Sequence, residues 1–153
     1  MKIRSGFVSN SSSSSFIVID TKDNNIIVPV LPEHLIVDGD LGTTEFGWQN
    51  ERYYDFGSKL IFAYLQTIYE DSKRKADIWL SMIAFLLSKS ANVKKIEWRV
   101  SPDEYSGNKN YAYIDHASSA SEKQNIEMFD SEESLRGFLF GINSFIQNEN
   151  DNE

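Results

Sequence analysis

Two consecutive segments of helical apolar spacing, between residues 58 and 88, most constrain the fold of this chain. The first predicts a helix from Ser58, a good N-cap, to Ile68. Counted from Leu60 as position i, its apolar residues lie at i, i+1, i+4, i+5 and i+8. The second predicts a helix over Lys75–Ser88, whose apolar side chains cover most of the helix circumference. A helix that is apolar all round is usually buried, so this one is expected to be the central, most buried helix. The short break at residues 70–73 predicts that the two helices pack as an antiparallel pair.

Strand patterns lie on both sides of this helical region. Val93–Val100 alternates apolar and charged residues, which predicts a strand with one buried and one exposed face. Shorter runs predict further strands at residues 16–19, 26–30, 35–37, 44–48, 111–115, 126–129 and 144–147. A polar turn separates the first two of these runs, so they are expected to pair as a hairpin.

A third helix is expected near residue 130. Asp130 is its predicted N-cap, because Glu133 then occupies the third helical position, as in a capping box. Gly141 is expected to end the helix in the left-handed conformation. The predicted buried stripe consists of Leu135, Phe138 and Leu139.

These patterns together predict a single α+β domain over residues 1–153. The expected architecture is a mostly antiparallel sheet with three helices, two of them consecutive. The length of 153 residues fits one domain. A serine-rich segment at about residues 9–15 and a short acidic tail at residues 148–153 are expected to flank this domain.

Composition excludes several classes of protein. The chain has no cysteine, which rules out disulfides, cysteine zinc sites and a thiol nucleophile. Its longest apolar runs have six residues, whereas a membrane-spanning helix needs about 20. The basic start is followed by serines where a signal peptide would have its apolar region. A cytoplasmic protein with no membrane partner is therefore expected.

The negative charge is concentrated in the C-terminal third. The net charge is −8, and residues 102–153 hold 11 acidic and 3 basic side chains, which accounts for all of it. Nucleic acid is a poor partner for such a chain, because phosphates bind clustered Lys and Arg. A protein with a basic surface is the expected partner. The acidic residues expected to contact it are Asp130, Glu132, Glu133, Glu149 and Asp151.

The serine-rich segment has three interpretations. Serine favours irregular structure, so a turn or flexible segment, or a hydroxyl-rich strand edge, is the favoured one. The second is a phosphate-binding loop, although the fixed Gly and Lys of a P-loop are missing. The third is a recognition or modification signal. The phosphate-binding hypothesis involves Ser11, Ser12, Ser13, Ser14 and Ser15.

Asp115 and His116 are the most obvious candidates for a catalytic pair. Adjacent residues on a strand point to opposite faces, so they are poorly placed to serve one site. A histidine that hydrogen-bonds to loop backbone at a strand end is the favoured interpretation. The only other histidine is His34, which argues against a histidine-rich metal site. A metal held by carboxylates stays an open alternative, although no EF-hand spacing occurs. No metal ligand, cofactor or catalytic residue is assigned.

The N-terminal sequence carries a resemblance. Gly6–Asn10, followed by five serines and Phe16, resembles the opening of a set of small uncharacterised proteins from bacteriophages and prophage-bearing bacteria. Further segments similar to this set are Glu45–Gln49, Tyr113–His116, Phe138–Phe140, Ser144–Gln147 and Asn150–Asn152. No activity or site residue carries over from these proteins. The resemblance implies a phage or mobile-element source and a role in the host cell.

These observations favour a non-enzymatic binding protein that uses its acidic C-terminal third to engage a basic host protein. Inhibition of a host enzyme or defence system is one form that such binding would take. The alternative is an enzyme, or a nucleotide- or phosphate-binding protein, that uses the serine-rich segment.

Overall fold

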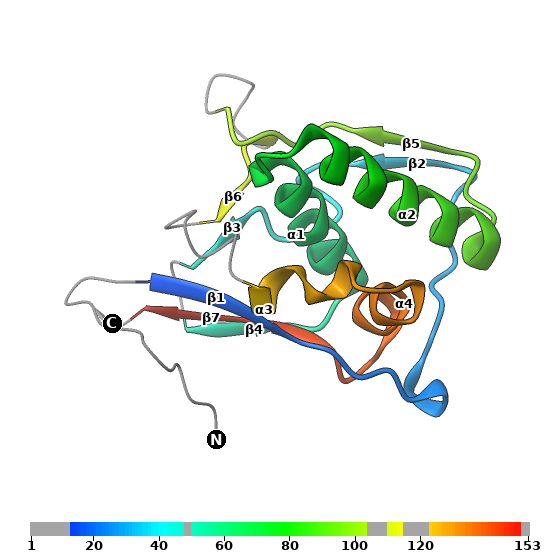
Figure 1. Ribbon diagram of the computed structural model, residues 1–153, viewed down its shortest axis with the longest axis horizontal. Coiled ribbons are helices and arrows are strands. Elements are labelled where there is room, and N and C mark those ends of the chain that lie inside the picture. Colours follow the sequence, from blue (N-terminus) through cyan, green and yellow to red (C-terminus); the bar gives the residue numbers. More distant parts are fainter. Residues whose placement is uncertain (1–12, 48–49, 104–109, 115–122, 151–153) are drawn as a thin grey trace.

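Helix α1 (Phe56–Tyr69) lies at the centre of the fold. The computed structural model describes residues 13–47, 50–103, 110–114 and 123–150 (Figure 1). The Asp55 carboxylate caps α1 by accepting a hydrogen bond of 2.9 Å from the Ser58 backbone N–H. Ten of the fourteen residues of α1 are buried, and the helix contacts α2, α4 and β6.

Helix α2 (Lys73–Ala91) packs on α1 and α4 with one of its faces. Ser72 caps its start, and Asn92 ends it with φ of 58°, a left-handed conformation that Asn tolerates well. Its buried residues are Trp79, Ile83, Leu86 and Leu87. The prediction that this helix is the most buried is therefore wrong, because α1 takes that position and α2 keeps a solvent-exposed face.

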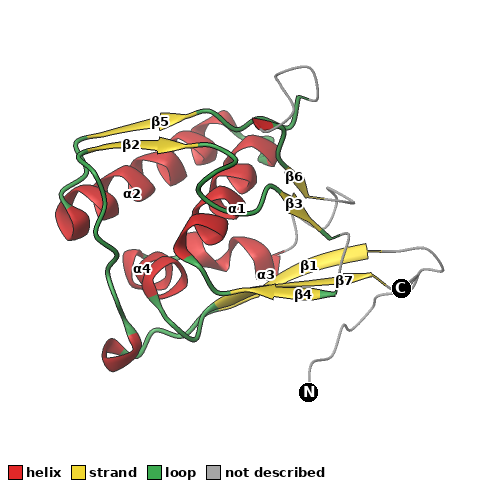
Figure 2. Ribbon diagram, turned by 180° about the vertical axis from the view of Figure 1, so that it is seen from behind, coloured by secondary structure: helices red, strands yellow, loops and turns green. Residues whose placement is uncertain are grey.

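Three of the strands form an antiparallel sheet in the order β1-β7-β4. They are β1 (Ser13–Val18), β7 (Phe145–Asn150) and β4 (Glu51–Tyr53). Four more strands form two parallel pairs, β2 (His34–Val37) with β5 (Lys95–Trp98), and β3 (Glu45–Phe46) with β6 (Tyr113–Ile114). The helices lie between the antiparallel sheet and the β2–β5 pair (Figures 1 and 2). The α+β class and its antiparallel sheet are confirmed.

The predicted hairpin between residues 16–19 and 26–30 does not form. Strand β1 pairs with β7 instead, at the other end of the chain. In the expected second strand, Ile26 makes only an isolated bridge with Gly141, and Val30 is fully exposed. Pro29 interrupts this segment, because proline cannot donate to a strand ladder.

The described residues from 123 to 140 are helical except at Asp130 and Ser131. Residues 126–129, expected to form a strand, belong to α3 (Lys123–Ile126) and a 3₁₀ turn (Glu127–Phe129). Helix α4 (Glu132–Phe140) is capped by Ser131 rather than Asp130, and the Ser131 Oγ accepts from the Ser134 N–H at 3.0 Å. Gly141 has φ of −70°, so it is not left-handed. A Cβ there would lie 2.3 Å from the Gly137 carbonyl oxygen, so close packing requires glycine.

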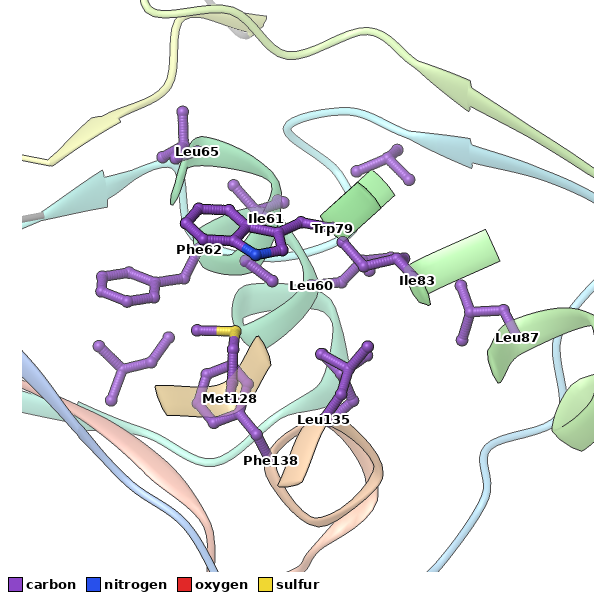
Figure 3. Close-up of a cluster of buried hydrophobic side chains, with 14 of the residues drawn as sticks. Leu60, Ile61, Phe62, Leu65, Trp79, Ile83, Leu87, Met128, Leu135 and Phe138 are labelled. Atoms are coloured by element: carbon purple, nitrogen blue, oxygen red, sulfur yellow. The ribbon is translucent and has the colours of Figure 1, made fainter. Parts of the chain in front are cut away.

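The hydrophobic core joins α1, α2, α4 and the 3₁₀ turn (Figure 3). Trp79 of α2 stacks on Phe129 with 4.5 Å between ring centroids. Phe46 of β3 meets Phe62 of α1 edge-on at 5.1 Å. The predicted stripe of α4 is confirmed, since Leu135, Phe138 and Leu139 are all buried.

The C-terminal segment is part of the sheet. Asn148 is 1% exposed and pairs with Ser15 of β1 and Glu51 of β4. The boundary of the predicted acidic tail at residue 148 is therefore wrong, because β7 continues to Asn150.

Candidate functional site

Within the serine-rich segment, the described residues Ser13–Ser15 lie in strand β1. Ser14 and Ser15 are buried in β1, an edge strand of the antiparallel sheet. The Ser15 Oγ donates to the Asn148 Oδ1 at 2.9 Å, and the Ser15 carbonyl accepts from Asn125 Nδ2 at 2.9 Å. Successive N–H groups of an extended strand point to opposite sides, so Ser13–Ser15 do not form a converging phosphate cradle. Ser11 and Ser12 lie outside the described residues.

The structure does not bring the predicted acidic contact residues together. Asp130, Glu132 and Glu133 are exposed at the start of α4, where carboxylates are stabilised by the helix dipole. Glu149 lies in β7, and α4 and the C-terminal end of β7 are at opposite ends of the sheet (Figure 1). Asp151 lies outside the described residues. Among the described members of this set, Asp130, Glu132 and Glu133 are the ones that can act as one surface.

The candidate catalytic pair, Asp115 and His116, lies outside the described residues. The other histidine, His34 of β2, lies at the surface with its Nε2 3.1 Å from the Glu97 Oε1. Within the described ranges, no group of three or more His, Cys, Asp or Glu side chains is arranged to hold a metal ion.

Lys59 of α1 is a buried charged residue whose ammonium bonds to backbone carbonyls of the turn after α4. Its side chain is 1% exposed, and Nζ donates to the carbonyl oxygens of Gly141 at 2.9 Å and Ser144 at 3.2 Å. Burial lowers the pKa of Lys59 to about 8, which the nearby Asp55 carboxylate only partly opposes. Lys59 thus ties α1 to the turn after α4.

Tyr53 of β4 is the other strongly shifted group. Burial, and then its hydrogen bond to Glu51, raise the pKa of Tyr53 to about 12. The hydroxyl donates to the Glu51 Oε2 at 2.5 Å. The bond stabilises the protonated phenol beside the carboxylate, and it fixes the end of a short strand.

The outer face of α2 carries an exposed apolar stripe. Ile78 and Phe85 are 47% and 59% exposed, and Met82 is partly buried between them. These three residues line a shallow hollow of about 420 Å³ together with Asp77 and Ser81. We call Ile78, Met82 and Phe85 the α2 stripe. Residues seven apart return to nearly the same helix face, so the stripe is continuous.

The acidic start of α4 borders the α2 stripe. Lys89 lies over the Phe85 ring, with Nζ 5.2 Å from the ring centroid. The same ammonium forms an ion pair with the Glu132 carboxylate. Asp130 and Glu133 are exposed beside Glu132 in the sequence. The stripe and the acidic group therefore form one surface with an apolar part and a negative edge.

A second hollow lies between α2 and β5, on the other side of Phe85. Its volume is about 530 Å³. Small residues of α2, Ser81, Ala84 and Ser88, line it from one side. Lys94, Lys95, Ile96 and Trp98 line it from the β5 side. Trp98 is held in place by stacking on Tyr64, with 4.2 Å between the ring centroids.

One feature of the sequence indicated these two hollows: α2 has more apolar residues than it can bury against the core. The apolar residues of α2 lie on most of its circumference, but a helix that packs with one face cannot bury all of them. The excess apolar residues, Ile78 and Phe85, therefore indicate a contact surface rather than a central helix. The contribution of β5 could not be seen in the pattern, because it depends on how the strand packs beside α2.

Comparisons with protein-family models, curated proteins and solved structures found no significant match. Within the part of the chain that the structure describes, no helix has the length and apolar character needed to cross a membrane.

Proposed function

We propose that this chain is a non-enzymatic binding protein that contacts a basic partner protein through the α2 stripe and the start of α4. The observation that carries this proposal is the exposure of Ile78 and Phe85 beside the carboxylates of α4. Isolated exposed apolar residues are common, but a continuous apolar stripe with a charged edge is typical of interaction sites.

The surface defines the chemistry of its partner. Apolar side chains of the partner would fill the hollow at Ile78 and Met82, and Lys or Arg side chains would meet Asp130 and Glu133. The net charge of −8 would speed encounter with a basic protein, and this steering would weaken as salt is added.

A phage or mobile-element source, which we also propose, fits this choice of partner. The resemblance of Gly6–Phe16 to phage and prophage proteins supports a mobile-element origin. We therefore place the protein in the cytoplasm of a bacterial host, where it binds a host protein. Blocking a host enzyme or defence protein is the role that such binding would serve.

Affinity purification from bacterial host cells tests this function with a matched pair of variants. Ile78→Lys introduces a positive charge into the α2 stripe, whereas Ile142→Lys makes the same change at a residue that is also 47% exposed. Ile142 follows the C-terminal end of α4, away from its acidic start. We expect Ile142→Lys to recover the partner as the native protein does.

We expect Ile78→Lys to reduce recovery about tenfold or more, since burying an unpaired charge opposes binding. Glu133→Lys should reduce recovery most at low salt, because it removes an attractive charge at the edge of the site. Equal recovery by the two isoleucine variants would contradict the proposed surface.

A further inference from the structure

We propose that β5 and the adjoining face of α2 form the interface of a symmetric dimer. In this dimer, β5 of one copy pairs antiparallel with β5 of a second copy, and Ile96 lies opposite Ile96. This inference concerns the hollow between α2 and β5, which shares Phe85 with the α2 stripe but leaves Ile78 and Met82 uncovered, and it does not rest on the partner proposed for that stripe.

The first support is the unpaired edge of β5. The backbone N–H groups of Lys95 and Arg99 bond to Glu33 and Val37 on the β2 side, at 3.0 and 2.8 Å. Alternate residues point to opposite edges of a strand, so the N–H and C=O groups of Ile96 and Trp98 face away from β2. Among the described strands, only β2 pairs with β5, which lies outside β2 in both views of the molecule (Figures 1 and 2). An unpaired edge is a template for another strand.

The second support is that the charges of β5 are self-complementary in one register. With Ile96 opposite Ile96, Lys95 of each copy lies opposite Glu97 of the other, and the two-fold axis produces this pair twice. Lys95 forms no ion pair with another described residue, whereas Glu97 already contacts His34 and Arg99 of its own copy, so Lys95 of the second copy would join an existing charge cluster. Centring the pairing on Glu97 instead would place Lys95 opposite Arg99, and centring it on Lys95 would oppose two lysines. Centring it on Trp98 would pair Glu97 with Arg99, which lies beyond the end of β5, so the Ile96 register is the one that pairs opposite charges within the strand.

The third support is the shape of the face beside this edge. A two-fold axis through Ile96 places the two α2 helices on the same side of a four-stranded sheet, where their facing sides can meet. The small residues Ser81, Ala84 and Ser88 leave space on this side of α2, and Phe85 projects next to them. Phe85 of each copy can fill the space above Ala84 of the other. Strand pairing and helix packing thus use the same two-fold axis.

The mass of the protein in solution tests this dimer. Sedimentation velocity over an about hundredfold concentration range should show a reversible change from the monomer mass of 17.5 kDa to twice that mass. Lys95→Glu and Glu97→Lys should each raise the dimer dissociation constant about tenfold or more, because each replaces two attractive pairs by two repulsive ones. The double variant should restore the dimer, because it restores both pairs with the charges exchanged.

Three further variants make the test decisive. Ala84→Glu changes an exposed helix position and leaves β5 intact, so it should fold normally and remain monomeric. Lys22→Glu makes the same charge change as Lys95→Glu at an exposed position away from β5, and it should dimerise like the native chain. Ile78→Lys should also dimerise, which separates this interface from the proposed partner surface. A native protein that stays monomeric at every concentration would overturn the proposal. A dimer insensitive to Ala84→Glu, or a double variant no better than the single variants, would overturn it as well.

Discussion

Replacing Lys59 by methionine should remove a distinctive pH dependence of stability. The Lys59 side chain is 1% exposed, and its pKa falls from the ordinary 10.5 to about 8 in the folded protein. Between about pH 8 and 10.5 the unfolded chain holds a proton that the folded chain has lost, so the free energy of unfolding rises with pH. A difference of about 2.5 pKa units limits this rise to about 3 kcal/mol.

Tyr53 opposes this rise in stability at the upper end of the pH window. Its pKa is about 12 in the fold against an ordinary value of 10.0, so the unfolded chain loses this proton first. Stability from Tyr53 is therefore lost as the pH rises above about 10. The rise due to Lys59 should be measured between about pH 8 and 10, where it is not yet offset.

Urea unfolding at closely spaced pH values measures this effect. We expect the native protein and Lys22→Met, which changes an exposed lysine, to become more stable across the window. Lys59→Met should lose the rise, although it leaves the Gly141 and Ser144 carbonyls without their donor, at a cost of about 1–3 kcal/mol each. If Lys59→Met kept the native slope, the assignment of a depressed pKa to this buried amine would be refuted.

Four further predictions concern the core, the sheet and the cap of α4. Trp79→Ala should lower the free energy of unfolding by about 3–5 kcal/mol in urea titrations, because it removes the ring stacked on Phe129; a loss well under this range would mean that the site is not tightly packed. Ser15→Ala should lower stability by about 1–2 kcal/mol, since it leaves the buried Asn148 Oδ1 without this donor, and Ser131→Gly, at an exposed cap, should lower it by only a few tenths. Deleting residues 148–153 should lower the thermal midpoint by several degrees, because it removes half of β7, and an unchanged midpoint would show that this pairing adds nothing.

The local elements were predictable where short-range patterns decide them. The helical spacing before Ile68 and the alternation around Ile96 indicated α1 and β5, since both periods follow from backbone geometry. Helix caps were predicted less accurately. Asp55 and Ser131 cap α1 and α4, whereas Ser58 and Asp130 were expected, because several neighbouring residues had suitable side chains.

Strand pairing could not be predicted from the sequence in the same way. Ser15 pairs with Asn148, which lies 133 residues further along the chain. Both residues are polar, so no apolar alternation in the sequence indicates that they pair in a buried position. The run at 26–30 looked like a strand, yet Val30 is fully exposed, and none of the described strands pairs with this segment. Pairing depends on the whole chain packing together, which local alternation does not encode.

The candidate site was predictable only in part. The count of acidic residues indicated a charged surface, but Glu149 and Glu133 lie on different parts of the molecule. The placement of Phe85 beside Lys89 and Glu132 depends on how α2 packs on α4. A charge excess in sequence therefore indicates a kind of partner, whereas the packing of helices decides where that partner can bind.

Side-chain labelling of the complex tests the proposed binding surface most directly. The partner recovered with the native protein would be added at saturating concentration, and hydroxyl-radical labelling would be compared with and without it. Dimer contacts would not affect Ile78 or Met82, so these two side chains report on the partner alone. The account predicts that their labelling falls several-fold on binding, while labelling of Tyr54, which is 46% exposed after β4, stays constant. Unchanged labelling of Ile78 and Met82 in a saturated complex would contradict the account.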